Sequence, residues 1–354
     1  MTITADHGRN EENRMKLLSI AVPCYNSAEY MEHCIDTLLT GGEDVEILIV
    51  NDGSTKDNTA EIADRYQAQY PSIVKAIHKE NGGHGSGVNM GLEKASGLYF
   101  KVVDSDDWVN TEVLSKILAK LREFSEMEHP VDMLLSNYTY EHVEDGTSHT
   151  VRYTGKMPEN KVFGWEELGR FRPDQNILMH SVIYRTQMLR DSGTKLPHHC
   201  FYVDNIFVYE PLPYVKTLYY LNENFYCYFI GRSDQSVNEE VFIRQVDQQL
   251  RVTYHMLNVC NPMQLDAPKR LRSYMLHYLS MMILICSVFL TLSKTEENEQ
   301  KRRKLWKDIR QMDEKLYRQL RYRTLCGLSD TPIVRKRQVL GNGYRLARKI
   351  FKFN

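Results

Sequence analysis

The sequence predicts an α/β fold with a Rossmann-like, mainly parallel sheet flanked by helices, and a helical extension toward the C-terminal end. Two observations lead to this prediction. Between residues 17 and 110, short apolar runs typical of buried strands alternate with segments of helical periodicity. Each apolar run also ends in a polar loop, as expected where parallel strands point their carboxyl ends toward one edge of a sheet.

The elements of this first part can be predicted in chain order. Strands are expected at 17–22, 45–50, 72–77 and 97–103, and helices at 27–39, 57–70 and 86–96. The helical segments keep their apolar residues on one side, and Asp57 or Asn58 is suited to cap the second of them. Strands and helices that alternate in this way form βαβ units, so we expect parallel strand pairing here.

The rest of the chain has a different character. A helix is expected at 110–121 and strands at 132–143 and 218–229, and helical patterns dominate after Ser236, including 241–257 and 301–320. The segment 273–293 carries no formal charge and is long enough to span a bilayer. Its polar residues share one helical stripe, which favours a helix packed within a soluble protein over a membrane span.

Composition limits the possible environments and partners. The 354 residues carry a formal net charge of −1, which gives no general attraction to nucleic acid. The seven cysteines are scattered without a C-x-x-C pair, which argues against a disulfide framework or a zinc site and fits a reducing cytoplasm. Residues 1–14 are polar and lack the apolar core of a signal peptide, so we expect a disordered tail.

Three carboxylates, Asp104, Asp106 and Asp107, follow the fourth expected strand within four positions. Such a cluster repels itself unless a cation neutralises it or water surrounds it. Aspartates two positions apart can turn toward one spot, and Mg²⁺ or Mn²⁺ favours such oxygen ligands. The alternative is a solvated turn in which Asp107 caps the next helix. The position favours the metal site, because ligands of open α/β sheets bind at the carboxyl ends of the strands.

The other polar loops are ambiguous one by one. Asp52 is either an ordinary turn residue or an acceptor of hydrogen bonds from a nucleobase or ribose. Tyr25 follows the first strand and either ends it or stacks on a base. The glycines of 81–87 serve either turns with positive φ or the close approach of a ligand. His84 among them suits a polar loop better than a metal site, since no second histidine stands at ligand spacing.

Taken in order, these motifs resemble those of a family 2 glycosyltransferase of the GT-A fold, of bacterial type. The resemblance covers 17 to about 110, with PCYN, NDGSTKDN, NGGHGSG and DSDD after successive strands, and it resumes over 200–237. Two positions depart from the family pattern. Val203 stands where the first acid of a Glu-Asp pair is usual, and Val88 where an arginine often precedes the asparagine of the glycine loop.

The resemblance implies roles for individual residues. Asp204 would be the catalytic base, and Asp104 and Asp106 would form the DXD pair that holds Mn²⁺ or Mg²⁺ with the donor diphosphate. Asp52 would bind the base, typically uracil, while a later segment closes over the diphosphate. The implied nucleotide- and donor-binding residues are Pro23, Tyr25, Asn26, Asp52, Asn81, Gly82, Asn89, Asp104, Ser105, Arg232 and Ser236.

The resemblance also implies an activity and an organisation. It implies an inverting, metal-dependent transfer of a sugar from a nucleotide sugar, typically a UDP-sugar, to a hydroxyl group of a cell-envelope glycan or glycolipid. It divides the chain into a nucleotide-sugar-binding half at 15–110, an acceptor-binding half at 111–237 and a helical region at 238–354. The basic, amphipathic end at 341–354 would either touch the inner face of a membrane or pack on this cytoplasmic protein.

Three other functions remain open. A dinucleotide-binding oxidoreductase would account for the spacing of Gly85, Gly87 and Gly91, although that fingerprint belongs at the first strand–helix turn. A nucleotidyltransferase shares the sheet and the metal but usually has a first loop rich in glycine and basic residues. A non-catalytic nucleotide-sugar-binding protein is the third.

Overall fold

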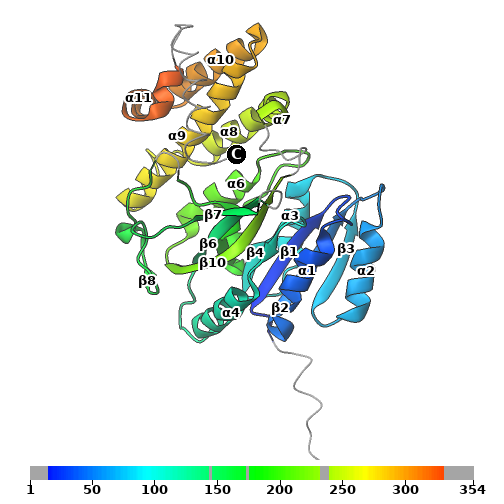
Figure 1. Ribbon diagram of the computed structural model, residues 1–354. Coiled ribbons are helices and arrows are strands. Elements are labelled where there is room, and N and C mark those ends of the chain that lie inside the picture. Colours follow the sequence, from blue (N-terminus) through cyan, green and yellow to red (C-terminus); the bar gives the residue numbers. More distant parts are fainter. Residues whose placement is uncertain (1–14, 143–145, 173–174, 232–238, 331–354) are drawn as a thin grey trace, which may run out of the picture.

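The computed structural model describes residues 15–142, 146–172, 175–231 and 239–330. The predicted tail at 1–14 and the predicted basic helix at 341–354 lie outside the described residues. Within the described part, a single large sheet is flanked by helices, and the helices of the C-terminal region pack beside it (Figure 1).

The first part of the chain follows the predicted alternation of strands and helices. Its elements are β1 (Leu18–Cys24), α1 (Met31–Leu39), β2 (Val45–Asp52), α2 (Thr59–Gln69), β3 (Val74–Lys79), α3 (His84–Lys94) and β4 (Tyr99–Val102). The strand β2 pairs in parallel with β1 and β3, and β1 pairs in parallel with β4. Every residue of β1 and β2 is buried, and strands covered on both faces have continuous apolar sequences.

The sheet continues into the second part of the chain. The further elements are β5 (Trp108–Val109), α4 (Thr111–Ser125), β6 (Met133–His142), β7 (Thr147–Val151), β8 (Val162–Phe163), β9 (Val182–Arg185), α5 (Thr186–Asp191), α6 (Asp204–Tyr209) and β10 (Leu218–Ile230). The main strand order is β3-β2-β1-β4-β9-β6-β10-β5. The strand β9, which was not predicted, is antiparallel to both β4 and β6. The edge pairs β10–β5, β10–β8 and β6–β7 are antiparallel too, so the sheet is mixed. One sheet therefore crosses the boundary predicted at residue 110.

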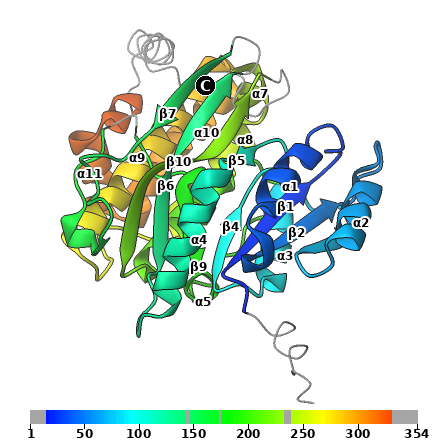
Figure 2. The same ribbon diagram turned by 60° about the horizontal axis from the view of Figure 1, so that its bottom comes forward.

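Helices cover both faces of this sheet (Figure 2). The core side chains form two groups, one shared with α1, α2 and α4 and the other with α3, α6, α8 and α9. Successive strand residues alternate between them: Ile20 faces the first group and Ala21 the second. Because helices cover both faces of the sheet, a ligand site is expected at the ends of the strands and in the loops that follow them.

The C-terminal region is helical, as predicted. Its helices are α7 (Glu239–Arg244), α8 (Val246–Val259), α9 (Lys269–Leu292), α10 (Glu296–Met312) and α11 (Glu314–Arg323). Among the described residues, α9 is the one helix long and apolar enough to cross a membrane, and 61% of its most apolar window is buried within the protein. It packs against α8 and α10, in agreement with the predicted core helix. The helix predicted at 301–320 is two helices, because the Asp313 carboxylate caps the start of α11.

Candidate active site

Hydrogen bonds join the loops that follow β1, β2 and β4. Asn26 has a φ of +50°, and its Oδ1 accepts the main-chain N–H groups of Thr55 and Lys56 at 3.2 and 3.1 Å. Ser105 Oγ donates to Ser27 Oγ at 2.9 Å. The polar loops therefore meet at the carboxyl edge of the sheet, as predicted from parallel strands.

Asp52 is buried at the end of β2 and organises the glycine loop that follows β3. Its carboxylate accepts the N–H groups of Gly82 at 2.9 Å and Gly83 at 2.7 Å, and Lys79 forms an ion pair with it. Asn81 donates to the main-chain oxygen of Asp52 at 2.9 Å. The carboxylate for which the resemblance implies base binding holds this loop in the structure. Lys79 is a partner that no motif indicated.

The packing of the protein itself accounts for the glycines of this loop. Gly83 has a φ of +81°, a conformation that favours glycine. A Cβ atom on Gly85 would lie 2.9 Å from Pro197 O, and one on Gly87 would lie 3.0 Å from Pro23 Cβ. Close approach is therefore needed between α3 and the rest of the chain, and the glycine spacing does not require a dinucleotide.

Asn89, on α3, binds the main chain of Leu196 with both ends of its side-chain amide. Its Nδ2 donates to Leu196 O at 2.9 Å, and its Oδ1 accepts the Leu196 N–H at 3.0 Å. These bonds fix the segment that leads to α6. Both ends of the Asn89 amide thus serve the protein's own main chain, and its role as a donor contact stays a prediction.

The acid cluster follows β4, and its last member is the most buried. Asp107 is 1% exposed and accepts the Tyr226 hydroxyl and the main-chain N–H of Phe229, the latter at 2.8 Å. Burial, with the charges of the other two aspartates, raises the pKa of Asp107 well above its usual range. Asn110, not Asp107, caps α4, so the solvated-turn alternative is wrong.

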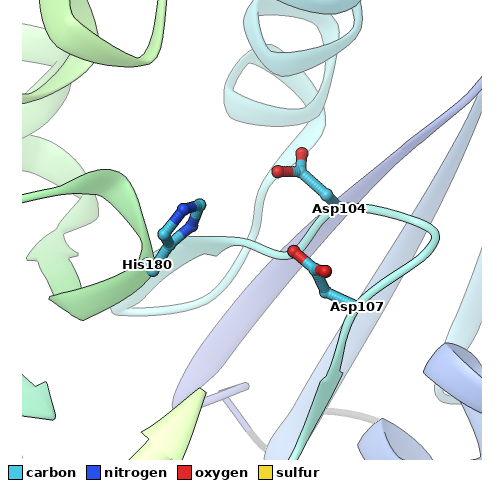
Figure 3. Close-up of side chains that lie close together, drawn as sticks. All are labelled: Asp104, Asp107 and His180. Atoms are coloured by element: carbon cyan, nitrogen blue, oxygen red, sulfur yellow. The ribbon is translucent and has the colours of Figure 1, made fainter. Parts of the chain in front are cut away.

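His180 lies beside this cluster, although it is remote in sequence (Figure 3). The possible ligand atoms of Asp104, Asp107 and His180 all lie within 4.8 Å of one another. The imidazole stacks on the rings of Tyr226 and Tyr228, with 4.7 Å between ring centroids in both pairs. No motif marked this histidine, because its place depends on how β9 and β10 pack.

The residues of this cluster fit a divalent cation. Burial lowers the pKa of His180 to about 4, so its imidazole is neutral near pH 7. Its Nδ1 atom is buried and has no hydrogen-bond partner within the described part of the chain. A neutral imidazole and two carboxylates can all serve as ligands of a divalent metal. Asp106, predicted to bind metal with Asp104, is partly buried on the same loop but outside this group of three.

His84, the first residue of α3, pairs with Asp104. The distance from His84 Nε2 to Asp104 Oδ1 is 2.7 Å. Burial alone would lower the pKa of His84, but the charge of Asp104 and this hydrogen bond outweigh burial and raise it. Burial alone would raise the pKa of Asp104, and His84 lowers it instead. His84 therefore offsets part of the charge repulsion among the carboxylates. The prediction of a polar loop histidine did not include this role.

Asp204 is the first residue of α6, within the electrostatic influence of this pair. Burial raises the pKa of Asp204 to about 6, while His84 opposes that increase and Asp104 adds to it. Asn205 Nδ2 donates to Asp204 Oδ1 at 3.2 Å, and the hydroxyl of Tyr278 on α9 donates to Asn205 Oδ1 at 3.1 Å. The apolar helix α9 thus supports the predicted base through a neighbouring side chain.

The remaining predicted residues differ in exposure. Pro23 is buried in β1, whereas Tyr25 is 51% exposed and can offer a ring face to a ligand. Arg232 and Ser236 lie outside the described residues.

Comparison with known proteins relates the first part of the chain to a known family. Residues 19–179 match the family model of glycosyl transferase family 2. The glycosyltransferase GlyG of Streptococcus pneumoniae is 35% identical over 133 residues, which make up 37% of this chain and 42% of GlyG. This chain spans less than half the length of the curated relatives that it matches first.

Solved structures agree at the level of the fold. Residues 1–349 of S. aureus TarS match with a TM-score of 0.64 at 20% identity, over 94% of this chain and 92% of that one. The same fragment in complex with UDP-GlcNAc gives a TM-score of 0.59 at 19% identity, with the same coverage. The mannosyltransferase PcManGT from Pyrobaculum calidifontis, in complex with GDP-Man and Mn²⁺, gives 0.50 at 13% identity, over 94% and 88% of the two chains. This chain therefore has the GT-A fold, and its residues 19–179 match glycosyl transferase family 2.

Proposed function

We propose that this chain is an inverting, metal-dependent glycosyltransferase that moves a sugar from a UDP-sugar to a hydroxyl group of a cell-envelope glycan or glycolipid. One observation carries the proposal. A partly buried acid of raised pKa, Asp204, and a cation-compatible cluster around Asp104 occur in one site at the carboxyl edge of the sheet. The match to family 2 and the complexes of structurally similar proteins with nucleotide sugars support it.

The donor nucleotide would bind over the loops after β1, β2 and β3. The exposed ring of Tyr25 would stack on the base, above Pro23 and Asn26. Asp52, Asn81 and Gly82 would form the polar side of the pocket, where the glycine loop is already fixed by hydrogen bonds. Ser105 would face the phosphates, and the segment of Arg232 and Ser236 would close over them.

The cation, Mn²⁺ or Mg²⁺, would be held by Asp104 with Asp106, and the structure adds Asp107 and His180 as candidate ligands. A histidine among the ligands favours Mn²⁺ over Mg²⁺, which prefers oxygen. When bound, such a cation supplies positive charge for the diphosphate leaving group.

Asp204 would act on the acceptor. Its carboxylate would accept the proton of the attacking hydroxyl group at Oδ1 or Oδ2 as the bond to the donor sugar forms. A pKa of about 6 keeps this carboxylate ionised near pH 7 and still basic enough to take a proton. A single displacement of this kind inverts the anomeric centre. We propose a cytoplasmic location for this reaction, with the segment 341–354 as the contact to the membrane that carries a lipid-linked acceptor.

The test is the release of UDP from a panel of UDP-sugars by the full chain, with and without Mn²⁺ and with and without saccharide acceptors. We expect release that depends on both the metal and an acceptor, and that EDTA abolishes. Full activity in EDTA overturns the metal dependence. Pyrophosphate release would identify a nucleotidyltransferase and oxidation of NADH an oxidoreductase. Nucleotide-sugar-dependent thermal stabilisation without turnover would identify a binding protein.

A further inference from the structure

Lys101 is completely buried in the middle of β4, one of the central strands of the sheet. A lysine is rarely buried without partners, because its ammonium group is costly to remove from water. The ammonium of Lys101 donates to three main-chain oxygens: those of His180 at 2.7 Å, Met179 at 3.2 Å and Val182 at 3.3 Å. All three of its hydrogens can thus be used on one short segment.

That segment carries His180. It consists of the 3-10 helix Met179–Ser181 and the start of β9, and Lys101 donates to its carbonyl groups. The Lys101 Nζ atom also lies 4.9 Å from the ring centroid of Tyr226, and the same ring stacks on the His180 imidazole. Lys101 therefore contacts both the main chain of His180 and the ring of Tyr226, on which the His180 imidazole stacks.

Support of this turn alone would not require a buried lysine. A serine or asparagine could satisfy one or two carbonyl groups without burying a charge, and an apolar residue would fill the core. The three carbonyl groups all point to Lys101 Nζ, which requires one defined conformation of the turn Met179–Val182. The same turn carries the His180 imidazole, which lies beside Asp104 and Asp107.

We infer that Lys101 is a positioning residue, which fixes the His180 imidazole against Asp104 and Asp107 and so sets the geometry of the cation site. The inference rests on the cation site of the proposed function. It adds a residue that touches neither the substrates nor the cation and acts through His180.

The experiment measures Mn²⁺ affinity of the full chain by electron paramagnetic resonance of free Mn²⁺, with UDP present and no turnover. The variants are Lys101→Met, His180→Asn and the double variant, with Lys75→Met as a matched lysine-to-methionine control on β3, where the side chain is 53% exposed. We expect His180→Asn and Lys101→Met each to weaken Mn²⁺ binding by about 10- to 100-fold. The double variant should bind no more weakly than His180→Asn alone, because residues that act through one another are not additive.

Thermal unfolding of each variant separates positioning from folding. Lys101→Met removes the donor that three carbonyl groups share. If this variant does not fold, Lys101→Gln, which keeps two N–H donors, takes its place with the same expected result. Wild-type Mn²⁺ affinity in the folded lysine variant, beside weakened binding in His180→Asn, overturns the role of Lys101 and leaves the cation site intact. If the losses of Mn²⁺ affinity in the two single variants multiply in the double variant, Lys101 does not act through His180 and the inference is overturned. A wild-type chain that binds no Mn²⁺ overturns the cation site and this inference together.

Discussion

His84 Nε2 lies 2.7 Å from Asp104 Oδ1, so the first residue of α3 provides a counter-charge for the first aspartate of the acid cluster. Each partner shifts the pKa of the other. The pKa of His84 is raised and that of Asp104 is lowered, although burial opposes both changes. The pair therefore stabilises the fold most where both groups are charged, between the usual pKa values of an aspartate and a histidine.

The substitution His84→Gln should destabilise the protein in a pH-dependent way. The raised pKa of His84 contributes stability that is fully present below the usual histidine pKa and is lost as pH rises through the folded value. We expect a loss of up to about 1 kcal/mol at pH 5.5, since the side chain is 36% exposed, and almost none at pH 8.5. Urea unfolding at the two pH values measures this, with His198→Gln as a control. An equal loss at both would contradict the ion pair.

The substitution Asp204→Asn should lower the rate of sugar transfer by ~10²- to 10⁴-fold, because the general base is lost. Binding of the nucleotide sugar should be unchanged. In the wild type, the rate should rise with pH and level off above the Asp204 pKa of about 6, since only the ionised carboxylate accepts a proton. Rate measurements across pH 5 to 8 check both points, with Asp191→Asn as a control. Transfer at the parent rate would place the base elsewhere.

The same substitution should stabilise the folded protein above pH 6. The pKa of Asp204 is raised on folding, so the folded state binds its proton more tightly, and stability falls as pH rises from about 4 to about 6. An uncharged amide avoids this cost, and we expect a gain on the order of 1 to 3 kcal/mol at pH 7.5. At pH 3.5 the variant and the wild type should unfold at similar urea concentrations. A loss of stability at pH 7.5 would show that the ionised carboxylate is well solvated.

The substitution Asp106→Asn should leave the fold intact and remove most of the transfer activity. Asp106 is only partly buried, so its charge is available for metal or phosphate contact, although it lies outside the group formed by Asp104, Asp107 and His180. Circular dichroism and UDP release measure the two outcomes. Normal turnover in this variant would exclude Asp106 from the metal site.

The substitution Asn89→Leu should reduce stability by about 2 kcal/mol or more, since the Leu196 N–H and carbonyl group both lose their partner. UDP affinity of the folded fraction should stay within about threefold of the wild type. Thermal unfolding and calorimetric titration with UDP test this, with the exposed neighbour Glu93→Gln as a control. Lost UDP binding at unchanged stability would support the predicted donor contact.

Several parts of this fold and site could be predicted from the sequence. Each expected strand and helix up to residue 110 is present, because apolar periodicity is a local property of the chain. The convergence of the polar loops followed from the parallel pairing of β1, β2 and β4. Asp104 and Asp204 could be named as candidates because each belongs to a local motif.

What the sequence by itself determined is therefore the layered α/β architecture and the edge of the sheet where polar side chains gather. Only the tertiary structure decided which of those side chains touch. His180 and Lys101 meet because the four-residue strand β9 inserts between β4 and β6, and a strand so short has no periodic signal of its own. The packing of α3 likewise turned Asn89 inward to Leu196. Contacts between remote segments depend on how whole elements fit together, and no local pattern of residues encodes that fit.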